Sequence, residues 1–385
     1  MKLIKSFKAL RPTKGKENDV IAPPYDVLNS SEAREMAKNK PFSFLHVSKP
    51  EIDLDPEIEF NNPSVYEKGE ENLKELINKK ILIQDDKECL YVYEIFLNGI
   101  SQTGVGCVAS VEAYEKNLIK KHEYTKPEKE DDRVNNIIKL NAQTGPVLLA
   151  YKNNNQISKL LNKVKNENPT YNVISHDNSN HKIWIVEDNR RIREILDEIN
   201  SMDSLFIADG HHRSAAALRV KKELSKKNPN HIGDENYNYF LAVAFPHSEM
   251  NILDYNRIIK GLNGHTTDTL LSNIEKKFSV KKHEIEFKPK NINTFGMYLD
   301  NYWYELITNQ ENINSIDPVK SLDVSILHDL IIEPLLGITD ERTDPKIDFV
   351  GGARGLKELE NRVDKDGFDI AFALFPTPIE SLINV

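Results

Sequence analysis

The chain has 385 residues, of which 39% are hydrophobic and 29% are charged, and these values are typical of a soluble globular protein. This length allows two or three domains, or one elaborated α/β domain. The formal net charge of −9 excludes an overall basic field that would attract nucleic acid or anionic lipid. No apolar run approaches the ~18 residues of a membrane span, so we expect a cytoplasmic protein with no membrane partner. Cys89 and Cys107 are too few for a disulfide framework or a cysteine-based zinc site, and we expect both to be buried.

The N-terminal region is expected to be extended before it becomes helical. Two consecutive prolines at 23–24 exclude helix and favour extended backbone, so Tyr25 and Asp26 follow a stiff segment. A helix is expected to begin near Ser30, with a serine as its N-cap, and a second helix is expected over residues 65–79.

Apolar runs further along the chain predict strands and helices in alternation. The runs 89–97 and 102–111 are joined by Asn98 and Gly99, a combination that predicts a β-hairpin. The alternation indicates an α/β (α+β) fold class, with domains over residues 1–263 and 264–385, because the composition changes beyond Gly264. The other expected strands cover residues 147–151, 182–186, 238–246 and 370–376, and the other expected helices end near 141 or cover 160–164, 192–202, 211–226 and 322–336.

Residues 204–217 predict a strand, a tight turn and a helix in succession. Asp209 and Gly210 form the turn, and His211, His212 and Arg213 fall in the first helical turn. Asp-Gly is also an ordinary turn dipeptide, and His or Arg at a helix start can simply be solvated. Cations at a helix N-terminus, however, oppose the helix dipole by roughly 0.3–1 kcal/mol each. We therefore expect an anion such as phosphate to bind at this helix start.

Other polar clusters lie at the ends of apolar runs, where loops commonly carry function. Taken singly, each cluster is more often solvated or capping, but together they mix acids with His and Arg, as an acid/base and phosphate site does. Magnesium held by Asp or Glu fits better than zinc, because the histidine spacings match no zinc pattern. P-loop, Rossmann, Gly-x-Ser-x-Gly and His-Glu-x-x-His motifs are all missing from the sequence. The clusters are Tyr25 with Asp26, His46 with Ser48, His122 and Glu123 with Thr125, Asp132 with Arg133, and Asn256 with Arg257.

The stretch 209–213, Asp-Gly-His-His-Arg, resembles the Gly-x-x-Arg helix-start motif of the ParB/sulfiredoxin superfamily, whose members bind nucleotide phosphates there. It is closer to the branch that contains free L-serine kinases. Within that branch, a widespread prokaryotic-type family is similar to nearly the whole chain, through the motifs at 22–26, 122–125 and 255–257. Sulfiredoxins need a cysteine where this chain has histidine, so reduction of cysteine sulfinic acid is disfavoured. Members of the family usually continue past the final strand into a tail containing Pro and Lys.

The resemblance implies a ParB/sulfiredoxin-like core with large insertions and a C-terminal α/β region. It also implies transfer of a phosphoryl group to the hydroxyl of free L-serine, giving O-phospho-L-serine for cysteine synthesis. We favour pyrophosphate over ADP or ATP as donor, because the sequence has no recognisable adenine-binding signature. By this resemblance, the phosphates are bound by Gly210, His211, His212, Arg213 and His122; the base is Asp209, Glu123 or Asp26; Mg²⁺ is held by Asp209 and Glu123; and the substrate is contacted by Tyr25, Thr125, Asn256 and Arg257. We also assign Arg133, from the polar cluster with Asp132, to phosphate binding.

Two other functions use the same anion site. A ParB-like, nucleotide-dependent DNA-binding or regulatory protein would need a basic face and a helix-turn-helix, whereas this chain is acidic and has no clear helix-turn-helix. A metal-dependent phosphatase acting on a small phosphomonoester would also suit the motif. All of these readings predict small-molecule ligands, and the sequence leaves the oligomeric state open.

Overall fold

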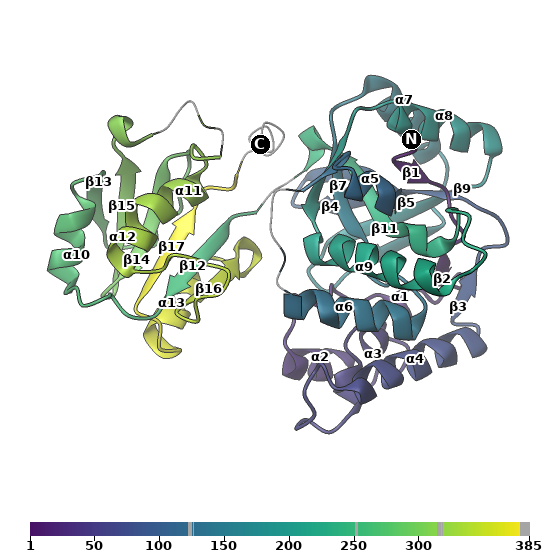
Figure 1. The fold of residues 1–385 in the computed structure, drawn as a ribbon, viewed down its shortest axis with the longest axis horizontal. Helices are drawn as coiled ribbons and strands as arrows, with labels where there is room; N and C mark the ends of the chain where they lie inside the picture. Colours follow the sequence, from purple (N-terminus) through teal and green to yellow (C-terminus); the bar gives the residue numbers. More distant parts are fainter. Residues whose placement is uncertain (122–124, 126, 251–252, 314–316, 318, 378–385) are drawn as a thin grey trace. The chain divides into compact units, whose positions relative to one another are not determined.

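The computed structural model describes residues 1–385 except 122–124, 126, 251–252, 314–316, 318 and 378–385. The chain forms two compact units, Met1–Met250 and Asn251–Val385, and each contains both helices and a sheet (Figure 1). The expected α/β (α+β) class is therefore confirmed. The sequence placed the boundary at Gly264, whereas the structure assigns β12 (Tyr255–Ile259) to the second unit, because this strand pairs only with strands of that unit's sheet among the described residues.

In the described part of the first unit, nine strands form a mixed sheet in the order β6-β10-β7-β11-β5-β4-β9-β8, and β1 pairs with β5 as well. β10 runs parallel to β6 and β11 runs parallel to β7, whereas the other neighbouring strands are antiparallel. The strands are β1 (Ile4–Lys5), β4 (Leu90–Leu97), β5 (Ile100–Ser110), β6 (Ile119–Lys120), β7 (Val147–Tyr151), β8 (Tyr171–Ile174), β9 (Asn180–Val186), β10 (Leu205–Asp209) and β11 (Tyr239–Pro246).

Helices surround this sheet and bury its apolar side chains. Ile157 of α7 and Ile195 of α8 lie in the same buried cluster as Val92 and Val105 of the central strands. Cys107 belongs to this cluster too, so the expectation of buried cysteines is confirmed. The helices of this unit are α1 (Glu17–Val20), α2 (Ser30–Ala37), α3 (Leu45–Ser48), α4 (Pro63–Asn78), α5 (Val111–Glu115), α6 (Pro127–Leu140), α7 (Asn155–Lys165), α8 (Asn189–Asn200) and α9 (His211–Lys227), with short 3₁₀ turns at Pro50–Asp53, Asn236–Asn238 and His247–Glu249.

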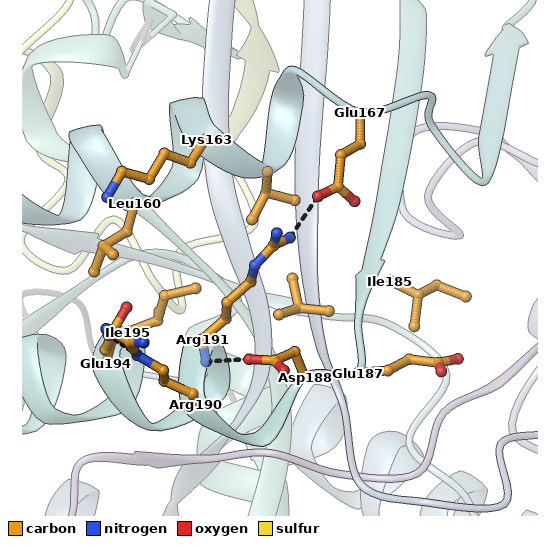
Figure 2. A pocket seen from close by; sticks show the side chains of 12 residues that line it. Leu160, Lys163, Glu167, Ile185, Glu187, Asp188, Arg190, Arg191, Glu194 and Ile195 are labelled. Carbon is orange, nitrogen blue, oxygen red and sulfur yellow. Dashed lines mark hydrogen bonds and ion pairs between the residues drawn. The ribbon is translucent and has the colours of Figure 1, made fainter.

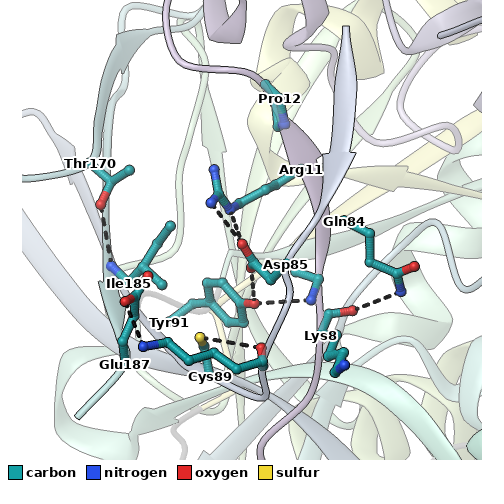
Figure 3. A network of polar contacts seen from close by, with 12 residues as sticks. Lys8, Arg11, Pro12, Gln84, Asp85, Cys89, Tyr91, Thr170, Ile185 and Glu187 are labelled. Atoms are coloured by element: carbon teal, nitrogen blue, oxygen red, sulfur yellow. Dashed lines mark hydrogen bonds and ion pairs between the residues drawn. The ribbon is translucent and has the colours of Figure 1, made fainter. Parts of the chain in front are cut away.

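A polar network attaches the N-terminal segment to the main sheet (Figure 3). The small sheet of β2 (Leu10–Pro12) and β3 (Leu82–Gln84) carries Arg11, whose Nε donates a 2.7 Å hydrogen bond to Asp85. The hydroxyl of Tyr91, on β4, donates a 2.5 Å hydrogen bond to the other oxygen of Asp85, and Arg11 also donates to the hydroxyl of Tyr171 at 2.6 Å. Asp85 therefore joins the two sheets.

Local signals in the sequence predicted several elements of this unit correctly. Asn98 and Gly99 have φ angles of 51° and 81° and connect β4 to β5, which confirms the predicted hairpin. The predicted helix near Ser30 is α2, but its N-cap is Asn29, which forms a capping box with Glu32.

In the described part of the second unit, six strands form an antiparallel sheet in the order β13-β15-β14-β17-β12-β16. Met297 and Phe372 face the core under α10, α11 and α12, whereas Tyr298 and Ala373 face the core under α13, so helices cover both faces. The remaining elements are β13 (Phe278–His283), β14 (Thr294–Leu299), β15 (Tyr302–Thr308), β16 (Ile347–Gly351), β17 (Ile370–Leu374), α10 (Thr267–Ile274), α11 (Asp323–Leu327), a π-helical turn at His328–Ile332, α12 (Glu333–Leu336) and α13 (Leu356–Lys365), with 3₁₀ turns at Gln310–Asn312 and Gly352–Arg354.

The single helix expected over residues 322–336 is thus interrupted by the π-helical turn. Within the described residues, no helix is both long and apolar enough to cross a membrane.

Candidate functional site

The turn between β10 and α9 requires glycine. Gly210 is the N-cap of α9 and has a φ of +96°, in the left-handed region that favours glycine. A Cβ atom at this position would lie 3.2 Å from Cζ of Arg213 and 3.2 Å from Cα of Val147. The side chain of Arg213 therefore folds back across Gly210, where any larger residue would displace it.

Arg213 is anchored by two neighbours. Its guanidinium donates one hydrogen bond to the carbonyl oxygen of Pro146, directly before β7, and another to the carboxylate of Asp209, at the end of β10. The Arg213 side chain is 14% exposed, whereas the Asp209 side chain is 64% exposed. The turn therefore presents a fixed cationic group beside an accessible carboxylate.

Arg213 lines a small cavity together with two other residues that the sequence predicted for the site. Tyr25, Arg133 and Arg213 come from three separate segments of the first unit, and all three face this cavity. The enclosed volume is about 20 Å³, which corresponds to about one water molecule, so a whole phosphate needs more room than the cavity encloses. The other lining residues, which sequence reasoning missed, are Asn136, Ile137, Gln143, Thr144 and Gly145.

Arg133 is held between an aromatic ring and a carboxylate. Its Cζ lies 4.0 Å from the centre of the Tyr25 ring, within the range of a cation–π interaction. Its Nε and Nη2 donate hydrogen bonds of 2.8 and 2.5 Å to Asp132, whose other oxygen accepts a 3.0 Å bond from the hydroxyl of Tyr66. Burial raises the pKa of the Tyr25 hydroxyl, and the charge of Asp26 adds to this rise, while Arg133 opposes it.

The two arginine-bearing helices pack directly together. Val134 of α6 and Ala216 and Val220 of α9 form one buried apolar cluster. Arg133 directly precedes Val134 on α6, and Arg213 lies in the first turn of α9. The packing of the two helices therefore sets the distance between the two arginines.

The remaining predicted residues of the first unit differ in accessibility. His211 is buried at 5% exposure, whereas His212 is partly exposed and Asp26 is exposed. The hydroxyl of Thr125 donates a hydrogen bond to Glu130, which also pairs with Arg219. His122 and Glu123 lie outside the described residues.

Asn256 and Arg257 lie on β12 of the second unit and have buried partners there. Asn256 donates a 2.6 Å hydrogen bond to Asp254 and accepts one of 3.0 Å from the backbone N–H of Leu374. Arg257 donates a 3.2 Å hydrogen bond to Glu341, and both side chains are almost fully enclosed. These contacts hold strands and loops of the second unit together, and the role predicted for both residues in substrate binding stays a prediction.

A larger hollow of about 680 Å³ lies between α7, α8 and the end of β9 (Figure 2). Its charged side chains largely satisfy one another. Arg191 donates a 2.6 Å hydrogen bond to Glu167, Arg190 pairs with Glu194 at 2.9 Å, and Asp188 caps α8 by accepting from the backbone N–H of Arg191. The hollow is lined by none of the residues that the sequence predicted for the site, so we take the Arg213 cavity as the candidate anion site.

The fold and the site together define a two-unit protein of the mixed α/β class with a two-arginine cavity beside a helix N-terminus. A family model described as "Protein of unknown function (DUF1015)" matches residues 4–325, so the chain belongs to this family. The comparison with curated proteins found no match.

Among solved structures, the chain is similar to a conserved hypothetical protein from Pyrococcus furiosus, with 14% identity over 72% of this chain and 83% of that chain, and a TM-score of 0.34. It is also similar to a free serine kinase in complex with AMP, with 13% identity over 73% of this chain and 81% of that chain, and a TM-score of 0.33. A mutant free serine kinase in complex with ADP has 14% identity over 72% of this chain and 80% of that chain, with a TM-score of 0.34.

Proposed function

We propose that this protein is a phosphotransferase that transfers a phosphoryl group to the hydroxyl of free L-serine and forms O-phospho-L-serine. The observation that carries the proposal is the meeting of Tyr25, Arg133 and Arg213 at one cavity beside the start of α9. These residues come from distant parts of the sequence; Tyr25 and Arg213 lie in motifs that resemble the free serine kinase branch, and Arg133 lies in a polar cluster that we assigned to the same site. We extend the proposal to a ParB/sulfiredoxin-type core built on β10, Gly210 and α9.

The arginines suit the binding of a phosphorylated donor. Both guanidinium groups stay charged at any physiological pH, and each has N–H donors beyond the two hydrogen bonds that it gives to its neighbours, so each can still donate to a phosphate oxygen. Arg213 is held in place by Pro146 and Asp209, so little conformational entropy is lost when an anion binds. The cavity encloses only about 20 Å³, so we place one phosphate oxygen inside it and the rest of the donor outside.

In the transfer, the serine oxygen forms a bond to phosphorus while the bond from phosphorus to the leaving phosphate breaks. The hydroxyl proton passes to a carboxylate. Asp209 lies next to Arg213 and Asp26 next to Tyr25, so either carboxylate is a candidate base in the described region, and Glu123 is a third candidate from the sequence. The exposed carboxylate of Asp209 is also an oxygen ligand of the kind that Mg²⁺ prefers, and bound Mg²⁺ would neutralise phosphate charge.

Pyrophosphate is the donor we favour, because the cavity is small and its charged lining residues are arginines. The test supplies Mg²⁺ and L-serine to the full-length protein with pyrophosphate, ADP or ATP in turn, and follows O-phospho-L-serine by mass spectrometry. Phosphoserine formed from pyrophosphate supports the full proposal. Phosphoserine formed from ATP alone means that ATP is the donor and pyrophosphate is not. The absence of phosphoserine with all three donors overturns the kinase function, and phosphate release without serine supports a phosphatase.

A further inference from the structure

The π-helical turn in the second unit gathers three side chains that commonly bind metals. A π-helix places residue i+5 near the face of residue i, which an α-helix does not. His328 and Glu333 are five residues apart, and Nε2 of His328 lies 3.9 Å from a carboxylate oxygen of Glu333. Asp329 completes the group, since one ligand-type atom from each of the three residues lies within 4.8 Å of the others.

The ring of His328 is oriented by a carboxylate outside this group. Nδ1 of His328 lies 3.0 Å from Oε1 of Glu341, a contact that favours the tautomer with its hydrogen on Nδ1, because a carboxylate oxygen accepts. In a neutral imidazole, Nε2 then has the lone pair, and this atom faces Glu333. Histidine ligands of metals are held in the same way, by donating the other ring N–H to a carboxylate.

The carboxylates around this turn are of two kinds, those that pair with an arginine and those that do not. Glu341 accepts a hydrogen bond from Arg257, and Asp340 accepts two hydrogen bonds of 2.7 Å from Arg342. Within the part of the chain that the structure describes, no ion pair joins Asp329 or Glu333 to a lysine or an arginine. Two neighbouring carboxylates without a basic partner repel each other, and a bound cation would remove this repulsion.

We propose that His328, Asp329 and Glu333 bind a divalent first-row transition cation, and that Glu341 positions His328 for it. One imidazole nitrogen and two carboxylate oxygens suit Zn²⁺ or Mn²⁺ better than Ca²⁺, which takes oxygen ligands. Ligand atoms around Zn²⁺ lie roughly 3.5 Å apart, so closing from the present spacing needs only small rotations of the exposed Asp329 and Glu333 side chains. Water completes the coordination.

In this proposed site, the buried Arg257 has a role through its contact with Glu341. Arg257 donates a hydrogen bond to Oε2 of Glu341, while Oε1 of the same carboxylate lies 3.0 Å from Nδ1 of His328, so Arg257 helps to hold Glu341 against the ring. Arg257 thereby acts through Glu341 and is a positioning residue of the cation site. The inference is independent of the proposed kinase function, because it concerns residues of the second unit alone.

The experiment titrates untagged, metal-stripped, full-length protein with Zn²⁺ by calorimetry, in buffer without phosphate or chelator. We expect one equivalent to bind in the wild type and that equivalent to be lost in His328→Ala and in the double variant Asp329→Asn/Glu333→Gln. The matched control is His283→Ala, because His283 pairs with Glu305 at 3.2 Å with comparable exposure but belongs to no group of three ligands among the described residues. Thermal unfolding in the absence of metal checks that each variant is folded, and the exposed double variant provides the result if His328→Ala does not fold.

Glu341→Gln tests the positioning part separately. It should lower the affinity for Zn²⁺ by about 10- to 100-fold while the stoichiometry stays the same. A wild type that binds no Zn²⁺, or ligand variants that bind it with unchanged stoichiometry and affinity, would overturn the site, and unchanged affinity in Glu341→Gln would overturn the role of Glu341.

Discussion

Arg213 in the first unit and Arg257 in the second were both predicted from sequence motifs to contact small ligands, and their side chains are similarly enclosed at 14% and 9% exposure. Their partners differ. Arg213 pairs with an exposed carboxylate and lines a cavity, whereas Arg257 pairs with the largely enclosed Glu341, and its Cζ lies 5.2 Å from the centre of the Phe349 ring. Two arginines that are similarly enclosed can therefore have different surroundings, and the exposure of the partner carboxylate distinguishes them.

The largest effect is expected for Arg213→Ala. If Arg213 binds the donor phosphates, phosphoserine formation should fall by about 10³-fold or more, while the midpoint of thermal unfolding changes little. Arg213→Lys should recover only a small part of the activity, since a lysine cannot contact phosphate through two parallel hydrogen bonds. Initial rates with pyrophosphate and differential scanning calorimetry measure the two quantities.

The matched control for Arg213→Ala is Arg219→Ala on the same helix. Arg219 is 42% exposed and pairs with Glu130 and Asp131, and we expect near-normal rates in its variant. Near-normal turnover in Arg213→Ala itself would mean that the stretch 209–213 is an ordinary turn.

Arg257→Met should lower the free energy of unfolding and leave the rate of phosphoserine formation unchanged. Removing Arg257 leaves the largely enclosed Glu341 with His328 as its remaining ion-pair partner, which costs up to about 3–5 kcal/mol of unfolding free energy. Urea denaturation of the full chain measures the loss, and the double variant Arg257→Met/Glu341→Met should recover a large part of it. If Arg257→Met keeps its stability but loses phosphoserine formation, the motif at 255–257 belongs to substrate binding after all.

Gly210→Ala should lower both the free energy of unfolding and the rate of phosphoserine formation by moderate amounts. An L-residue at this φ costs about 1–2 kcal/mol, and the added Cβ would also push against Arg213, so the transfer rate should fall as well. The matched control is Gly233→Ala, because Gly233 has a φ of +91° and nothing within 4 Å of an added Cβ. Gly233→Ala should lose a comparable amount of stability and keep its rate of phosphoryl transfer. If both variants lose the same fraction of the transfer rate, Gly210 has no particular role in positioning Arg213.

The smallest effect concerns a pair in the first unit that lies outside the cavity lining. A 2.8 Å hydrogen bond with Asp53 raises the pKa of His46 above 6.5, so its stabilising contribution is fully present below that pH and is lost as the pH rises through the folded-state pKa. We therefore expect the difference in unfolding free energy between the wild type and His46→Gln to shrink as the pH is raised from 6 to about 9. A difference that stays constant over this range would show that the pair contributes no pH-dependent stability.

Local chemistry explains why parts of the candidate site could be predicted. The strand, the turn at Gly210 and the start of α9 follow from an apolar run, a residue tolerant of positive φ and a run of helix formers. Tyr25 and Arg213 were predicted from motifs that resemble the family, and Arg133 from its polar cluster with Asp132; the structure brings these three to one cavity. The residues that sequence reasoning missed, Asn136 and the turn at 143–145, carry no local signal, because they become lining residues only when α6 packs against α9.

What the sequence alone determined about this protein is its local structure: the hairpin at Asn98 and Gly99, the position and start of α9, and the mixed α/β class. Each depends on backbone preferences and on apolar periodicity within a few residues. The tertiary structure alone decided that β12 belongs to the second unit, that a π-helical turn interrupts the helix expected over 322–336, and that Arg257 pairs with Glu341. These features depend on strand pairing and packing between residues far apart in the chain, for which the local sequence has no equivalent signal.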